Sequence, residues 1–219
     1  MKSFVISSIL ATSSVYALPS IVRAGQTQFG MLCSFLVEYP LTFCLAGVNI
    51  AGFDFGCTTD GSDDLTSVTP PLPNLGGPDG ASQMRHFVND DNLNIFRLPV
   101  GWQYLLNNNV GGTLDATNFG NYDQLVQACL STGASCIIDI HNYARWNGQI
   151  IGQGGPTNDQ FANIWSQIAT KYKNTPNIIF GLMNEPHDVN IQEWAVSVQA
   201  AVTAIRTAGA TSQISSLLS

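Results

Sequence analysis

The sequence predicts an α/β fold in which a parallel sheet is built from repeated strand–helix units. Short runs that are almost continuously apolar alternate with longer segments whose apolar residues recur every three or four positions. Strands that are apolar on both sides are typical of a parallel sheet covered by helices. Four such units and a fifth strand are too many for a small module and too few for a closed eight-stranded barrel, which takes about 250 residues.

The predicted strands are short apolar runs bounded by turn-forming residues. A stretch rich in Gly, Pro and Asp at 60–80 is predicted to be a long loop, and Pro176 breaks the chain before the fourth strand. The strands are expected at 46–52, 94–100, 135–140, 178–183 and 214–218.

The predicted helices follow from apolar residues spaced by one helical turn. Thr157 and Gln160 form a capping-box pattern at the start of the third helix, and Gly133 lies where the second helix needs a C-terminal cap. The helices are expected at 84–88, 118–130, 157–172 and 191–207. The apolar stripe of the fourth consists of Ile191, Trp194, Ala195, Val198, Val202 and Ile205.

Composition narrows the possible partners. The chain has 219 residues, 45% of them hydrophobic, which suffices for one domain with a packed core. Its formal net charge is -7. Such a surface repels phosphate backbones, so we expect no nucleic-acid partner. A neutral polysaccharide would not be repelled.

The N-terminus has the pattern of a secretory signal peptide at residues 1–17. Lys2 supplies the positive start, an apolar stretch follows, and Val15-Tyr16-Ala17 has the spacing that signal peptidase accepts. The apolar part is too short to cross a bilayer, so we expect a secreted, extracellular protein with no membrane contact. The alternative is a buried N-terminal helix. Residues 18–45 are predicted to be an irregular N-terminal segment, and 46–219 to carry the fold.

The five cysteines fit an oxidising compartment. Cys129 and Cys136 flank a predicted turn and are expected to form a disulfide that joins the end of a helix to the next strand. The other three are Cys33, Cys44 and Cys57, so at least one stays unpaired unless the chain is incomplete or pairs with another. The alternative is that all five are buried thiols.

Polar and aromatic residues gather at the ends of the predicted strands. In parallel βα folds these C-terminal ends carry the working residues, because the βα loops open there. The candidates are Arg97, Trp102 and Tyr104 in or after the second strand, Asp139, His141, Asn142, Tyr143 and Trp146 at the third, and Asn184, Glu185 and His187 at the fourth.

Glu185 is the most informative of these candidates. It follows an apolar run and precedes Pro186, so its carboxyl group is expected to be partly removed from water, which favours the protonated form. A protonated carboxyl group near neutrality can donate its proton to a leaving oxygen. The alternatives are an ion pair with a nearby arginine or a cap on the fourth helix.

Arg97 lies inside an apolar strand and needs a counter-charge, because a guanidinium group stays protonated. A carboxylate across the mouth of the sheet would serve, as would an ion pair with Asp139 or Glu185. Asp139, His141 and His187 lack the tight spacing of metal ligands, so we expect no metal.

The aromatic residues divide into two groups. Trp102, Tyr143 and Trp146 lie in predicted βα loops, where exposed rings stack on the apolar faces of sugars. The alternative is loop packing. Trp165 and Trp194 lie on helical stripes and are predicted to be core. Phosphate-binding loops, dinucleotide fingerprints, serine nucleophile elbows and H-E-x-x-H motifs are missing from the sequence, so we expect no cofactor.

Several of these segments, taken together, resemble glycoside hydrolase family 5. The resemblance covers about residues 46–213, and its last two motifs point to the fungal endo-β-1,4-glucanases of that family. The motifs are F-R-L-P-V-G-W at 96–102, D-I-H-N-Y at 139–143, M-N-E-P-H at 183–187, A-G-V-N-I-A-G-F-D at 46–54 and I-I-G-Q-G-G-P at 150–156.

The resemblance implies a (β/α)8 TIM barrel, of which about the first four to five βα units are present, that cleaves β-glucan with retention of configuration. It implies that Glu185 is the general acid/base and that Asn184 binds the sugar 2-hydroxyl. Arg97 would support the nucleophile and His141 would shape the subsite at the cleaved bond. The predicted substrate contacts are Tyr143, Trp146, Trp102 and His187.

The sequence departs from the family in two places. The family's nucleophile is a second Glu after the seventh strand, and retention needs two carboxyl groups about 5–5.5 Å apart. This chain ends near the fifth strand and lacks that residue. Similar fungal enzymes carry a cysteine a few residues after Cys57, where this chain has Ser62-Asp63-Asp64.

We therefore expect a truncated or mis-spliced sequence, in which residues 31–45 are translated intron and the tail after Gln213 is a frameshift; sequencing the transcript tests this. The intact form is expected to be a monomeric endo-acting β-1,4-glucanase, and the chain as written inactive or nearly so. The alternatives are a non-catalytic half-barrel that at most binds glucan and a β-glycanase of other specificity, such as a mannanase.

Overall fold

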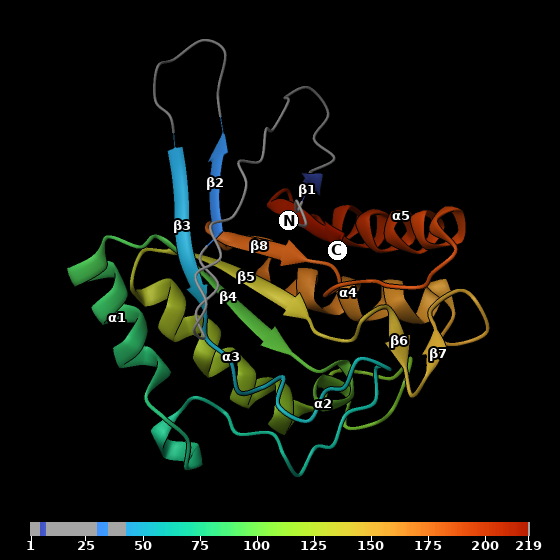
Figure 1. Cartoon of the computed structure of the whole chain (residues 1–219), viewed down its shortest axis with the longest axis horizontal. Coiled ribbons are helices and arrows are strands. Elements are labelled where there is room, and N and C mark those ends of the chain that lie inside the picture. The colour runs from blue at the N-terminus through green and yellow to red at the C-terminus, as the bar shows by residue number, and fades with distance from the viewer. Residues whose placement is uncertain (1–4, 8–29, 35–42, 219) are drawn as a thin grey trace.

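The central sheet has the strand order β1-β9-β8-β5-β4-β3-β2 in a computed structural model that describes residues 5–7, 30–34 and 43–218. Strands β3, β4, β5, β8 and β9 are parallel, and the two edge strands β1 and β2 pair antiparallel with their neighbours (Figure 1). The strands are β1 Val5–Ser7, β2 Gly30–Ser34, β3 Phe43–Asn49, β4 Ile95–Val100, β5 Ser135–Ile140, β8 Ile178–Gly181 and β9 Gln213–Leu218. The alternating strand–helix pattern of the sequence thus gives the predicted parallel sheet.

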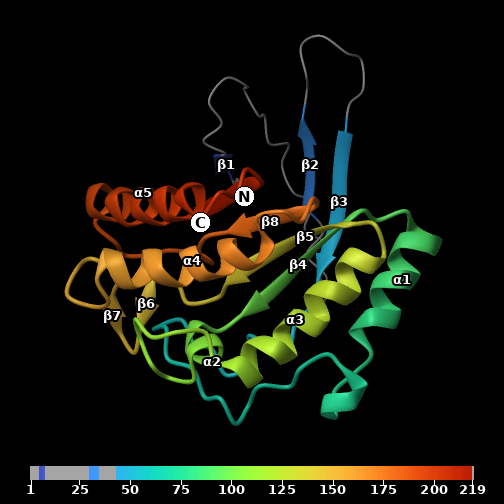
Figure 2. The same ribbon diagram turned by 180° about the vertical axis from the view of Figure 1, so that it is seen from behind.

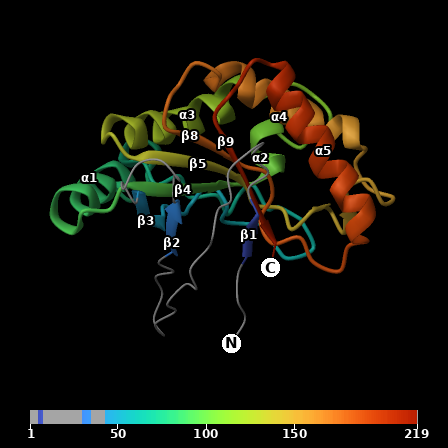
Figure 3. The ribbon, with the colours of Figure 1, turned by 90° about the horizontal axis from the view of Figure 1, so that it is seen from above.

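The helices lie on one side of this sheet. Seen from above, α1, α3, α4 and α5 form an arc around the strands (Figure 3), and the view from behind shows α3 and α4 across the sheet (Figure 2). This is the arrangement of the outer helical layer of a βα barrel. The helices are α1 Gly80–Asp91, α2 Trp102–Leu106, α3 Ala116–Ser131, α4 Asn158–Tyr172 and α5 Ile191–Thr207, with a 3-10 turn η1 at Pro73–Leu75.

The two faces of the sheet are buried to different degrees. Residues that point toward the helices, such as Phe96, Ile138 and Phe180, are fully buried. On the other face Asn49 is exposed and Arg97 only partly buried, although the sequence predicted strands buried on both faces. Alternation along a strand puts neighbouring residues on opposite faces, so the apolar core lies under the helices and the polar side chains line the inner face.

Local signals predicted the helix ends well. Thr157 and Gln160 form the expected capping box at the start of α4, and Asn190 accepts hydrogen bonds from the first turn of α5. Gly133, just beyond α3, has a φ of 81°, which few other residues adopt. Trp165 and Trp194 are buried in the core, as predicted.

The predicted disulfide between Cys129 and Cys136 is confirmed and joins the end of α3 to β5, with Cα atoms 6.2 Å apart. Cys57 is a free thiol. Cys33 and Cys44 are backbone partners in the β2–β3 ladder.

Several elements differ from the sequence-based expectation. Part of the segment predicted to be irregular forms the hairpin strands β2 and β3, and short elements lie within two predicted loops: α2, and the hairpin of β6 Arg145–Trp146 and β7 Gln149–Ile150. Of residues 1–17, only Val5–Ser7 lies within the described residues, as β1 and not as a helix. The signal peptide stays a prediction.

The buried stripe of α5 is rotated relative to the prediction. Trp194 and Ile205 are buried as expected, but Ser197 and Ala201 replace the predicted Ala195, which is exposed; Ile191, also predicted, is 57% exposed. The reason is that α5 packs against α4, where the Ser197 hydroxyl donates a hydrogen bond to Asn158 Oδ1 at 2.6 Å. A buried polar group with a partner costs little, so apolarity alone did not define this face.

Candidate active site

Side chains from neighbouring strands meet at the carboxyl end of the parallel sheet. Arg97 of β4 donates from Nη2 to Asp139 Oδ2 of β5 at 2.7 Å and to Asn184 Oδ1 after β8. Its Nη1 lies 3.5 Å from Oδ1 of Asn49, its backbone partner on β3. Parallel pairing therefore brings together polar residues that are up to 87 positions apart in sequence.

Asp139 is the centre of this cluster. Its side chain is 1% exposed and that of Arg97 is 16% exposed, and a buried carboxylate requires a cation and hydrogen-bond donors. The same Asp139 oxygen lies 3.2 Å from His141 Nδ1. Of the ion pairs that the sequence left open for Arg97, the structure contains the one with Asp139. The contact of Asp139 with His141 was not predicted.

Glu185 stays outside this network. Among the described residues its carboxylate has no hydrogen bond or ion pair, and α5 is capped by Asn190. Both structural alternatives for Glu185 are therefore wrong. Its φ of 34° lies in the left-handed region, and the side chain is half-buried directly after the buried residue Asn184. An unpaired carboxylate on a strained backbone is the kind of group that structures keep for chemistry.

Tyr143 lies between two histidine rings. Its ring centroid is 5.4 Å from that of His141 and 6.1 Å from that of His187, edge-on to both. The hydroxyl lies 3.4 Å from His141 Nε2. Burial, and to a lesser extent the negative charge of Glu185, raises the pKa of Tyr143, so this hydroxyl stays protonated.

His187 joins two loops at the mouth of the sheet. Its Nε2 lies 2.9 Å from the Thr59 carbonyl oxygen and its Nδ1 2.9 Å from Asp188 Oδ2. Both nitrogens thus face protein acceptors, which leaves the ring itself for any sugar contact. The role of His187 in substrate binding stays a prediction.

The predicted aromatic contacts do not all reach solvent. Trp102 is fully buried, packed against Trp146 and Phe161 at centroid distances of 5.2 and 5.8 Å. The prediction that Trp102 binds sugar is therefore corrected: it belongs to the core because α2 turns it inward. Trp146 is half-buried. Phe55, which the sequence analysis missed, is 48% exposed in the loop after β3, and no periodicity marks such a loop residue.

A buried amide pair supports the loop that carries Tyr143. Asn142 accepts from the Trp102 N–H at 2.6 Å and donates to Gln103 Oε1 at 2.6 Å, while Gln103 donates to the Gly61 carbonyl at 2.6 Å. Both amides are fully buried. Gly61 is required because a Cβ there would lie 2.6 Å from the Arg145 backbone. The three loops at the mouth are thereby held as one unit.

Asp63 occupies a confined position next to Cys57. The two are partners in an isolated antiparallel bridge, and a Cβ on Gly101 would lie 2.1 Å from Asp63 Oδ2. Burial raises the pKa of Asp63 to about 6 and, with the charge of Asp63, raises that of the Cys57 thiol. This carboxyl group stands at the place where similar fungal enzymes carry a second cysteine.

We expect the protein to lose stability between about pH 4 and pH 6 because of Asp63. The folded-state pKa is above the ordinary 3.8, so the folded protein binds more protons than the unfolded chain in this window. Stability therefore falls as pH rises, by roughly 2 kcal/mol at most. Urea unfolding across this range, with D63N as the test variant, should show a flatter pH profile for D63N. An unchanged profile would contradict the assignment, and D64N, at an exposed neighbour, is the control.

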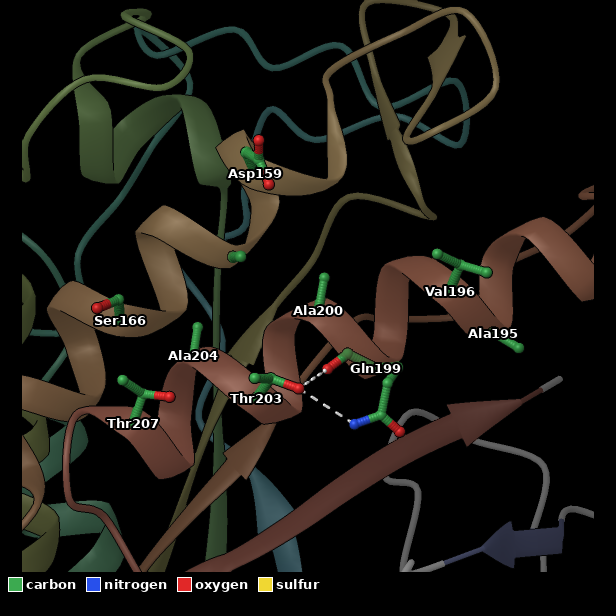
Figure 4. Close-up of a pocket in the computed structure, with 10 residues that line it drawn as sticks. Asp159, Ser166, Ala195, Val196, Gln199, Ala200, Thr203, Ala204 and Thr207 are labelled. Atoms are coloured by element: carbon green, nitrogen blue, oxygen red, sulfur yellow. Dashed lines mark hydrogen bonds between the residues drawn. The ribbon is translucent and has the colours of Figure 1, made fainter.

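A shallow groove lies elsewhere, on the outer surface between α4 and α5. It is lined by small and apolar side chains such as Ala162, Ala200 and Ala204, and Thr203 bonds back to Gln199 (Figure 4). None of the strand-end residues lines it. Within the described residues there is no group of three His, Cys, Asp or Glu side chains suited to a metal ion. No helix there is long and apolar enough to cross a membrane.

Parallel strands with helices outside and a polar cluster at their carboxyl ends define a protein of the βα-barrel enzyme class. The family model "Cellulase (glycosyl hydrolase family 5)" matches residues 53–216. The chain therefore belongs to glycosyl hydrolase family 5, the cellulase family.

Individual relatives agree with this assignment. The chain is 68% identical over 176 residues to endoglucanase EG-II of Hypocrea jecorina, covering 78% of this chain and 42% of that protein. It is 58% identical over 171 residues to endoglucanase 1 of Saitozyma flava, covering 77% and 47%. The crystal structure of Cel5A (EG2) from Hypocrea jecorina superposes with a TM-score of 0.76 at 67% identity, covering 78% of this chain and 53% of that one. The chain thus spans about half the length of these relatives, as a partial barrel.

Proposed function

We propose that this chain supplies the acid/base half of an active site that hydrolyses internal β-1,4-glucosidic bonds in cellulose and related β-glucans with retention. The observation that carries the proposal is the unpaired, half-buried carboxylate of Glu185 beside the Arg97–Asp139 cluster. Such a group can protonate a glycosidic oxygen and later deprotonate water. The endoglucanase names of the relatives support the substrate class.

The neighbouring residues fit supporting roles. Because Asn184 Oδ1 already accepts from Arg97, the Asn184 amide N–H groups are left to bind a sugar 2-hydroxyl. Arg97 Nε is buried without a hydrogen-bond partner among the described residues. A buried donor of this kind needs an acceptor, and we propose the nucleophile carboxylate, which would come from the seventh strand of a whole barrel.

A chimera tests this function. Residues 46–213 joined to the remaining barrel strands of the Hypocrea jecorina enzyme should release reducing ends from carboxymethyl cellulose, and less from mannan. We expect the chain alone to release almost none, because a retaining mechanism needs two carboxyl groups. Faster release from mannan would indicate a different glycanase, and an inactive but folded chimera would argue against the proposed hydrolase.

A second candidate function is glucan binding without hydrolysis by the chain itself. Phe55 is 48% exposed, and Tyr143 and Trp146 are half-buried, so these rings offer surfaces on which a sugar stacks. Binding of cellopentaose by a chain that releases no reducing ends would favour it. We further propose secretion directed by residues 1–17, which the disulfide supports because such bonds persist in oxidising compartments.

A further inference from the structure

The hydrogen atoms at the centre of the cluster can be counted. Arg97 Nη2 carries two hydrogens and lies near three acceptors: Asp139 Oδ2 at 2.7 Å, Asn184 Oδ1 at 2.5 Å and His141 Nδ1 at 3.3 Å. The two oxygens are at full hydrogen-bond distance, whereas the nitrogen is not. Both hydrogens of Nη2 are therefore used by Asp139 and Asn184.

The position of the proton on His141 follows from this count. His141 Nδ1 receives no hydrogen from Arg97, and it lies 3.2 Å from Asp139 Oδ2, a carboxylate oxygen that only accepts. A neutral imidazole has one N–H, whose position is set by the partner of each nitrogen. Nδ1 must therefore carry the proton, and Nε2 keeps its lone pair.

The Nε2 lone pair faces one hydroxyl group. Tyr143 Oη lies 3.4 Å from it, and the edge-on ring contact between the two residues keeps them in place. A phenol next to an unprotonated nitrogen points its hydrogen toward that nitrogen. The Tyr143 oxygen then presents only lone pairs to the open side of the site.

We propose that Asp139 is a positioning residue that fixes the Nδ1–H tautomer of His141 and, through it, makes the Tyr143 hydroxyl an acceptor for a sugar hydroxyl hydrogen. Asp139 suits this role because it is 1% exposed and its charge is balanced by Arg97. Carboxylates that hold the far nitrogen of a histidine set its tautomer at other kinds of site in the same way. The sugar-binding part rests on the proposed function; the tautomer does not.

Nitrogen-15 NMR of the full chain tests the tautomer without any ligand or variant of the cluster. The chain has three histidines, so H86Q and H187Q assign the remaining imidazole as that of His141. At a pH where the ring is neutral, we expect a protonated Nδ1 and an unprotonated Nε2. A proton on Nε2 in the unaltered chain would overturn the proposal, whether or not any variant folds.

Two substitutions of Asp139 separate positioning from folding. D139A frees an Arg97 N–H for His141 Nδ1, so the imidazole proton should move to Nε2; D139N keeps an acceptor oxygen and should retain Nδ1–H. Y122F is the control, because the buried Tyr122 hydroxyl donates to the Leu98 carbonyl on the same sheet and only stability should change. Retention of Nδ1–H in folded D139A would show that Asp139 does not set the tautomer.

Cellopentaose binding tests the consequence for the sugar. D139A and Y143F should each weaken binding about tenfold, as expected for one lost hydrogen bond, and the double variant should be no weaker than either single one. Additive losses would refute the link through His141. If the tautomer is as expected but no cellopentaose binds to the unaltered chain, the proposed function fails and the tautomer assignment stands.

Discussion

E185Q in the chimera should lower the turnover of carboxymethyl cellulose by about 10²–10⁴-fold, the range that proton transfer by a positioned side chain contributes. The amide has nearly the shape of the acid but no proton to give to the leaving oxygen. Because no described residue pairs with the Glu185 carboxylate, the fold should lose little stability. Reducing-end release and urea unfolding, measured on the same preparation, separate the two effects.

The matched control is E193Q. Glu193 is an exposed carboxylate in the first turn of α5, close in sequence but outside the strand-end cluster. We expect its turnover to stay within about twofold of the parent, since exposed substitutions of this kind shift stability by only about 0.5 kcal/mol. Equal activity of E185Q and the parent would remove the basis of the proposed mechanism.

R97M should destabilise the chain by about 3–5 kcal/mol, because it leaves the Asp139 charge buried without a cation. Asp139 is 1% exposed, so water cannot replace the guanidinium group. The same change removes the donor to Asn184 and therefore frees the amide that we expect to bind the sugar. The free energy of unfolding in urea measures the effect.

Two comparisons sharpen this result. R85M removes an exposed arginine that contacts Ser82 on α1, and we expect a change of about 0.5 kcal/mol or less. The double variant R97M with D139L removes both charges, and replacing a buried ion pair by apolar residues is often close to neutral. If the double variant is as unstable as R97M, lost packing and not the stranded charge is responsible.

Much of the outer layer could be predicted from sequence because its signals are local. The capping box at Thr157, the cap beyond α3 at Gly133 and the disulfide between Cys129 and Cys136 depend on residues within one turn of a helix or one tight connection. The strands were predicted as apolar runs, and the register of the parallel ladder then placed Arg97 beside Asn49. The predicted ends of strands also named most of the cluster.

The predictions that were wrong concern residues whose environment is made by distant segments. Trp102 was expected to be an exposed platform, but α2 turns it against Trp146 and Phe161. The buried face of α5 includes Ser197 because Asn158 on α4 accepts its hydrogen bond. A single sequence contains no signal for either contact, since each depends on how two helices or loops meet.

The amino-acid sequence by itself determined the order of strands and helices, the carboxylate at the end of the fourth predicted strand and the kind of chemistry it suits, because these follow from periodicity and from residue type. Only the tertiary structure decided which groups are paired. Asp139 holds Arg97 and His141, and Glu185 is left unpaired, because hydrogen-bond partners 42 and 87 positions from Arg97 are chosen by the geometry of the folded sheet.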